Sequence, residues 1–121
     1  MDADIFRRLK VVADALESKK AYRLTAFDVS TKTSIAEAFV LCSVGSSRQA
    51  RAVADEVDRC LVTEGVRALS VEGYQQGSWV LADYGDFILH IFTEERREFY
   101  ALERLWGDAP DVTAELRPGT T

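Results

Sequence analysis

The stretch "IAEAFVLCSV", residues 35–44, constrains the fold more than any other part of the chain. It is nearly all apolar, which is the composition of strands that are covered on both faces. A helix with clear boundary signals is predicted directly after it. Ser46 and Gln49 fit a capping box, Gly65 fits the helix end, and the apolar stripe between them consists of Ala50, Val53, Val57 and Leu61. A fully covered strand beside an amphipathic helix predicts an α/β domain.

The other elements follow from hydrophobic periodicity and from helix boundary signals. Apolar residues spaced four, three and four apart indicate a first helix: Ile5, Leu9, Val12 and Leu16. Strands are predicted at residues 22–29, 66–72, 78–83 and 86–92, and a last helix starts after Thr93 and ends at Gly107. The order αββαβββα predicts a single domain over residues 1–107 with a mixed five-stranded sheet and about three helices. The helix between the second and third strands makes that pair a candidate parallel crossover. Residues 108–121 show no partner pattern and are expected to form a flexible tail.

Composition and charge limit the classes of function. The 121-residue chain has a formal net charge of −5 and no Lys/Arg run longer than a pair, which disfavours direct binding of nucleic acid and favours a basic protein partner. With one His, two cysteines and no CxxC motif, no zinc site is expected, and Cys42 and Cys60 are expected to be core thiols. The start of the chain lacks the pattern of a signal peptide, and no apolar run approaches the roughly 20 residues that span a bilayer, so a cytoplasmic protein is expected.

Residues 78–92 are predicted to form a hairpin that gathers polar and aromatic side chains on one side. If Tyr84 and Gly85 form a two-residue turn, three pairs face one another on that side: Trp79 with His90, Leu81 with Ile88, and Asp83 with Asp86. The other side is apolar and is expected to meet the core helices through Val80, Ala82, Phe87, Leu89 and Ile91. Because two carboxylates that face each other repel by on the order of 0.2–1 kcal/mol, the first side is a candidate functional face.

The residues alone leave three functions of this face open. In the first, Asp83 and Asp86 hold Mg²⁺ and the loop Gly45-Ser46-Ser47 cradles phosphate, as in a metal-dependent nucleotidyl or phosphoryl transferase. In the second, the two carboxylates share a proton in acid–base catalysis. In the third, which the net charge favours, Trp79 anchors a protein partner and the carboxylates pair with its basic side chains. Purely structural roles are the alternative: the Asp pair caps the turn, and Trp79 and His90 belong to the core.

Several motifs resemble those of the ribosomal silencing factor (Iojap) family. Residues 27–57, "FDVSTKTSIAEAFVLCSVGSSRQARAVADEV", match a family pattern of D-V, S-I, G-x-S and R without gaps. Further along, the resemblance is carried by "VEG" at 71–73, "W" at 79, "DYGD" at 83–86, "HIF" at 90–92 and "YALERLW" at 100–106. It covers residues 5–106, although the loop "YQQGS" at 74–78 departs from the family.

The resemblance implies a nucleotidyltransferase-like fold without transferase activity, and therefore no catalytic residue, metal or cofactor. Members of the family bind ribosomal protein fourteen of the large subunit, block joining of the small subunit and lower translation when nutrients are scarce. They are often homodimers when free. The expected partner-binding residues are Trp79, Leu81, Asp83, Tyr84, Asp86, His90, Tyr100 and Glu103.

Overall fold

The computed structural model describes residues 2–100 and 108–116 of the chain. Its helices and strands follow the predicted order: α1 (Ala3–Ser18), β1 (Tyr22–Asp28), β2 (Ala38–Val44), α2 (Ser47–Thr63), β3 (Ser70–Glu72), β4 (Trp79–Asp83), β5 (Phe87–Thr93) and α3 (Glu94–Tyr100), followed by a short 3₁₀ helix (Thr113–Leu116). The α/β class and the mixed five-stranded sheet are confirmed. The strand β3 is shorter than the predicted 66–72, and the predicted continuation of α3 to Gly107 lies outside the described residues.

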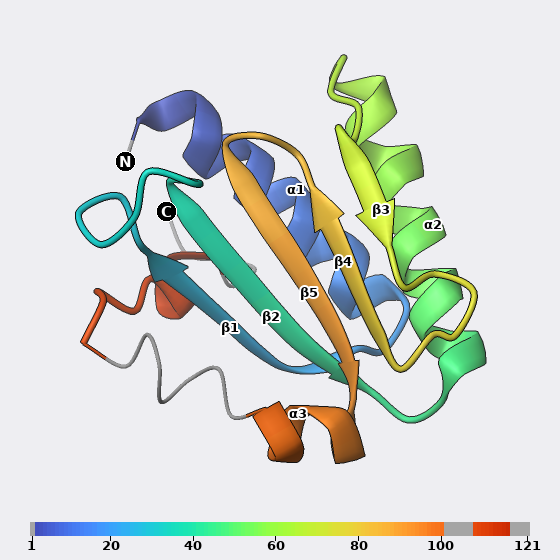
Figure 1. The fold of residues 1–121 in the computed structure, drawn as a ribbon. Helices are drawn as coiled ribbons and strands as arrows, with labels where there is room; N and C mark the ends of the chain where they lie inside the picture. Colours follow the sequence, from blue (N-terminus) through green and yellow to red (C-terminus); the bar gives the residue numbers. More distant parts are fainter. Residues whose placement is uncertain (1, 101–107, 117–121) are drawn as a thin grey trace.

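The five strands form one mixed sheet in the order β1-β2-β5-β4-β3. Its neighbours pair antiparallel except β2 and β5, which are parallel. The helices α1 and α2 lie together on one face of the sheet, and α3 lies beyond the end of β5 (Figure 1). The strands β2 and β3, which α2 connects, run in the same direction, as the predicted crossover requires. They are not neighbours in the sheet, because β5 and β4 lie between them.

The helix-side core explains the apolar composition of β2. All seven residues of this strand are buried. On the helix side, Val40, Cys42 and Val44 pack with the apolar stripes of α1 and α2. On the other side, Phe39 and Leu41 belong to a second buried cluster that also contains Phe27, Val29, Ala36, Ile88, Phe92 and Ala109. The prediction of a strand covered on both faces is confirmed.

The segment 108–116 is packed along the outer edge of β1, although the sequence suggested a loose tail from residue 108. The backbone N–H of Asp28 donates to the carbonyl of Pro110 at 2.9 Å, and the N–H of Val112 donates to the carbonyl of Ala26 at 2.9 Å. Leu116 is only 1% exposed and belongs to the helix-side core. Because one buried leucine and a few backbone bonds leave no periodic pattern, the sequence did not reveal this attachment.

Candidate functional site

The pairing of β4 with β5 differs from the predicted hairpin by two residues. Trp79 lies opposite Phe92, Leu81 opposite His90, and Asp83 opposite Ile88. The turn is displaced by one residue from the predicted Tyr84-Gly85 to Gly85-Asp86, since the N–H of Tyr84 donates to the carbonyl of Phe87 and closes the turn at 3.0 Å. A shift of two residues changes every partner but keeps each side chain on its face of the sheet. The division into an apolar helix side and a second, mixed side is therefore confirmed, while the predicted pairs are wrong.

The two aspartates do not form a facing pair of carboxylates. Asp83 Oδ1 accepts a hydrogen bond from the backbone N–H of Gly85 at 2.8 Å, so this side chain shapes the turn. Asp86 instead forms an ion pair with Arg8 of α1. Asp86 thus already has a basic partner within the chain, and its contact with another protein stays a prediction.

Trp79, His90 and Phe92 form an aromatic stack on the side of the sheet opposite α1 and α2. The indole Nε1 of Trp79 donates to His90 Nδ1 at 3.2 Å. The Trp79 ring lies 6.0 Å from the His90 ring and 5.2 Å from the Phe92 ring, centroid to centroid, with interplanar angles of 28° and 26°. Because His90 is only 6% exposed, its side chain holds the Trp79 ring in place and does not itself reach the surface.

Burial also sets the charge state of His90. Removal from water disfavours the imidazolium and lowers the pKa of His90 to about 4. The ring is therefore neutral near pH 7, and its Nδ1 lone pair is available to the Trp79 indole. The opposite nitrogen, Nε2, is buried and has no hydrogen-bond partner within the described structure.

This shift predicts that acid weakens the fold through His90. Between its ordinary pKa of about 6.5 and the folded value, the unfolded chain binds a proton that the folded chain does not, so stability falls as the pH is lowered through this window. Urea unfolding of the wild type and of His90→Gln at several pH values between about 4 and about 7 measures the effect. The variant keeps an acceptor for Trp79 but cannot titrate, so its stability should fall less steeply. Equal slopes for the two proteins would contradict the prediction.

The outward side chains of β4 form a half-exposed row. Trp79, Leu81 and Asp83 alternate with the buried Val80 and Ala82. Two exposed residues of β3 share this side of the sheet, because Ser70 pairs with Asp83 and Glu72 pairs with Leu81. We call these residues the β4 face: Ser70, Glu72, Trp79, Leu81 and Asp83. It has apolar groups at its centre and carboxylates beside them.

Three other residues of the predicted partner-binding set are not placed on the β4 face. Tyr84 is 7% exposed and lies on the helix side, where its ring stacks on Phe87 at 5.1 Å between centroids and its hydroxyl donates to Asp58 at 3.5 Å. Tyr100 ends the described part of α3, and its side chain is not described. Glu103 lies outside the described residues.

Arg97 is a buried cation that the sequence interpretation missed. Its side chain is only 3% exposed. Its guanidinium donates to the carbonyl of Arg23, to Thr25 Oγ1 at 2.9 Å and to Ser43 Oγ at 3.2 Å, which fixes α3 to β1 and β2. A signal was present, since Ser43 is a polar residue inside an otherwise apolar strand and must hydrogen-bond when buried.

The loop Gly45-Ser46-Ser47 is occupied by bonds within the chain. Ser46 Oγ accepts from the backbone N–H of Gln49 at 3.1 Å, as the predicted capping box requires. Gln49 Oε1 accepts at 2.7 Å from the N–H of Gly45, the residue before the N-cap. Gly77 packs against Ser47, so a Cβ at Gly77 would lie 2.7 Å from the Ser47 Cβ. Within residues 2–100 and 108–116, no group of three or more His, Cys, Asp or Glu side chains is arranged to hold a metal ion. The transferase interpretation therefore gains no support from this loop or from the aspartates.

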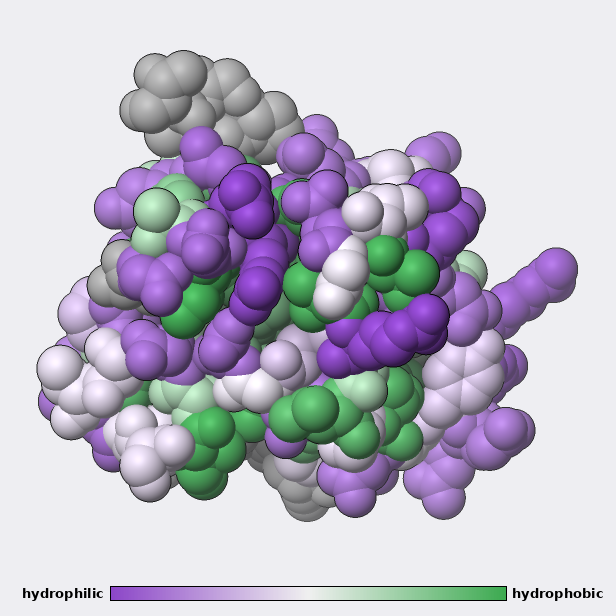
Figure 2. Space-filling view, turned by 90° about the horizontal axis from the view of Figure 1, so that it is seen from above, coloured by the Kyte–Doolittle hydropathy of each residue, from purple (hydrophilic) through white to green (hydrophobic). Residues whose placement is uncertain are grey.

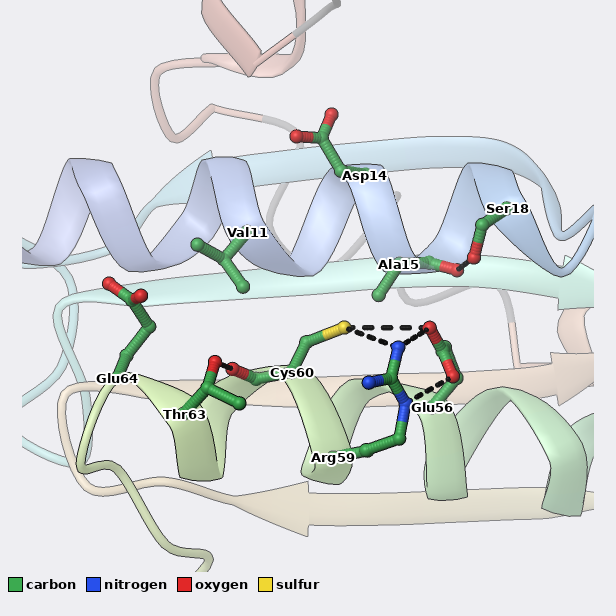
Figure 3. Close-up of a pocket in the computed structure, with 9 residues that line it drawn as sticks. All are labelled: Val11, Asp14, Ala15, Ser18, Glu56, Arg59, Cys60, Thr63 and Glu64. Atoms are coloured by element: carbon green, nitrogen blue, oxygen red, sulfur yellow. Dashed lines mark hydrogen bonds and ion pairs between the residues drawn. The ribbon is translucent and has the colours of Figure 1, made fainter.

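A groove of about 400 Å³ lies between α1 and α2. Figure 3 shows Val11 and Ala15 of α1 pointing toward α2, where Glu56, Arg59 and Cys60 interact with one another. Arg59 pairs with Glu56 at 2.7 Å, and the Cys60 thiol lies 3.5 Å from the same carboxylate. Burial and the Glu56 carboxylate raise the pKa of Cys60, which disfavours the nucleophilic thiolate. Both cysteines are free, and Cys42 is fully buried.

None of the helices in the part of the chain that the structure covers has the length and apolar character needed to cross a bilayer. Seen from above, hydrophobic groups form separate patches between hydrophilic side chains (Figure 2).

Comparisons with known proteins agree with this architecture. The family model described as "Ribosomal silencing factor during starvation" matches residues 2–120, which includes the segment that was expected to be a loose tail. A ribosomal silencing factor from Halalkalibacterium halodurans is 37% identical over 88% of this chain and 92% of its own. One from Bacillus subtilis is 36% identical over 84% and 86%, respectively.

Solved structures show the same fold. A crystal structure of a protein from Chromobacterium violaceum has a TM-score of 0.81 at 33% identity and covers 88% of both chains. A crystal structure of a protein from Bacillus halodurans has a TM-score of 0.76 at 33% identity and covers 86% of this chain and 94% of that one. With a match over nearly its whole length, this chain belongs to the family of ribosomal silencing factors during starvation.

Proposed function

We propose that this protein binds ribosomal protein fourteen of the large subunit through the β4 face and thereby prevents the small subunit from joining. Membership of the silencing factor family supports a role at the ribosome. The named partner comes from the resemblance of the sequence motifs. The location on the β4 face comes from the geometry of the site.

The observation that carries the location is the half-exposed, supported position of Trp79. An indole that is held by a hydrogen bond to His90 and by stacking on Phe92 presents its exposed part in one orientation. Such a side chain loses little conformational entropy on binding, and large aromatic residues of this kind dominate the energy of protein interfaces. Leu81 lies beside it on the same strand and extends the apolar centre.

The charges around this centre suit a basic partner. Glu72 and Asp83 lie on the same side of the sheet as Trp79, and the whole chain has a formal net charge of −5. Ribosomal proteins that contact RNA are basic, so their surfaces attract a carboxylate-bearing face. Complementary charge of this kind mainly raises the rate of association and fixes orientation.

The mechanism needs no chemistry at the β4 face. A protein bound where the two subunits meet excludes the small subunit by its volume, and silencing lasts as long as the complex does. This role places the protein in the cytoplasm, where subunits meet. The homodimer that the sequence resemblance implies stays a prediction.

Subunit joining in sucrose gradients tests the proposal. Purified large and small subunits are mixed with the wild type, with Leu81→Lys or with Val62→Lys. Leu81→Lys places a cation at the apolar centre of the β4 face, opposite Glu72 of β3, with which it can form a cross-strand charge pair. Val62, 37% exposed on α2, is the matched control in the helix layer. The wild type and Val62→Lys should sediment with large subunits and suppress joining, whereas Leu81→Lys should do neither.

Two outcomes would contradict the proposal in different ways. If the wild type stays at the top of the gradient, ribosome binding by this chain is wrong. If all three proteins sediment with large subunits equally, the protein binds the ribosome through a surface other than the β4 face.

A further inference from the structure

The outer edge of β3 is an open end of the sheet. Within the described structure β3 pairs with β4 alone, and all three of its residues are exposed. Leu69, directly before the strand, is 74% exposed, and Val71 in its middle is 46% exposed. Soluble proteins usually protect such an edge with Lys, Pro or a covering segment, because an open edge pairs readily with another strand.

The alternation of backbone hydrogen bonds along β4 shows which residue of β3 points its N–H and C=O away from the sheet. The N–H of Tyr84 donates to Phe87 in β5, so even-numbered residues of β4 bond toward β5. The carbonyl of Asp83 accepts from the N–H of Leu69 at 2.7 Å, as expected for odd-numbered residues that bond toward β3. Ser70 and Glu72 lie opposite odd-numbered residues of β4, so the backbone N–H and C=O of Val71, between them, point away from the sheet.

An acidic pocket of about 270 Å³ lies beside this edge, between α2 and the helix side of β3 and β4. Its apolar wall includes Ala54, Val71 and Ala82. Its polar wall includes two aspartates whose oxygens accept from tyrosine hydroxyls, Asp55 from Tyr74 at 3.0 Å and Asp58 from Tyr84 at 3.5 Å. An apolar wall that ends at carboxylates fits the stem and charged head of a Lys or Arg side chain.

We propose that β3 binds an extended, basic segment of the partner protein as a sixth strand of the sheet. The main chain of this segment pairs with the N–H and C=O of Val71, and a Lys or Arg side chain enters the pocket beside Asp55 and Asp58. The β4 face adjoins this edge, so one partner contacts both surfaces. The inference rests on the proposed function, because the large subunit supplies the partner in the test.

Replacing Val71 by Pro tests the strand addition. Proline removes the outward N–H and is tolerated on an edge strand where that N–H faces solvent, so pairing of β3 with β4 is preserved. Val71→Thr keeps the N–H and a similar shape and is the matched control. We expect Val71→Pro to weaken binding to purified large subunits by about tenfold or more, and Val71→Thr by less than about twofold.

The outcomes separate this inference from the proposed function. Failure of the wild type to bind large subunits overturns both. Binding of Val71→Pro with wild-type affinity overturns the strand addition alone.

Hydrogen exchange in the wild type provides a test that needs no variant. The Val71 amide should exchange rapidly in the free protein and at least about tenfold more slowly in the complex with large subunits. The amide of Glu72, which lies opposite Leu81 and faces β4, serves as the reference and should change little. An unchanged Val71 rate in a saturated complex overturns the strand addition.

The basic character of the segment is tested separately with the double variant Asp55→Asn/Asp58→Asn. Its affinity for large subunits should depend less steeply on salt concentration than that of the wild type, because two charges have been removed from the contact. An unchanged salt dependence overturns the assignment of a cation to the pocket.

Discussion

We expect Trp79→Ala to weaken binding to the large ribosomal subunit by about 2–4 kcal/mol, or about 30- to 700-fold in Kd. Trp79 is the largest side chain at the centre of the β4 face, and its ring is already oriented by His90 and Phe92. Truncation removes both the contact area and this preorganisation. Titration of fluorescently labelled protein with purified large subunits, followed by anisotropy, gives the two dissociation constants.

The same substitution also disturbs the protein itself, so a control is needed. Without the indole, His90 Nδ1 loses its hydrogen-bond donor, and the stack on Phe92 is reduced. Trp79→Phe keeps an aromatic ring on the stack and should retain part of the affinity. Urea unfolding of both variants establishes that they are folded under the binding conditions. If folded Trp79→Ala binds within about twofold of the wild type, Trp79 is not a central anchor and the location of the interface is wrong.

The second large effect is expected at Leu116. Leu116→Ala should lower the free energy of unfolding by about 2–5 kcal/mol, because the side chain is 1% exposed and its loss leaves a cavity in the helix-side core. Leu69→Ala is the matched control, since that leucine is 74% exposed and its truncation should change stability by less than about 0.5 kcal/mol. Equilibrium urea unfolding measures both variants. A Leu116→Ala protein as stable as Leu69→Ala would mean that the segment after residue 107 is not part of the folded core.

The secondary structure could be predicted because each element has its own local signal. The capping box at Ser46, the four-three-four spacing in α1 and the unbroken apolar run of β2 each depend on neighbours within a few residues. The sorting of β4 and β5 into two faces followed from alternation alone. These local signals predicted the elements correctly because tertiary packing does not oppose the local preferences.

The errors arose where a contact depends on distant parts of the chain. The pairing of β4 with β5 depends on which two residues form the turn, and the turn lies at Gly85-Asp86 instead of Tyr84-Gly85. The partner of Asp86 is Arg8, 78 residues away. The burial of Arg97 depends on acceptors in β1 and β2, so an adjacent pair of arginines could not reveal that one of them is enclosed.

The side of the sheet on which the candidate residues lie could be predicted, but their contacts could not. The sequence placed Trp79, Leu81 and Asp83 on one face, and the structure keeps them there. It assigned His90 to the contact itself, whereas burial makes His90 a support for the Trp79 indole. No local pattern distinguishes these two roles, because both place a polar aromatic ring on the same side of a strand.

The packing of residues 108–116 against β1 makes the two margins of the sheet unequal. Growth of sheets from molecule to molecule, as in a fibril, needs each copy to offer two open margins, one for the preceding copy and one for the next. Here the bonds from Val112 to Ala26 and from Asp28 to Pro110 occupy the β1 margin. Two copies that pair through β3 therefore offer no second open margin at β1, and growth of this kind stops at two copies.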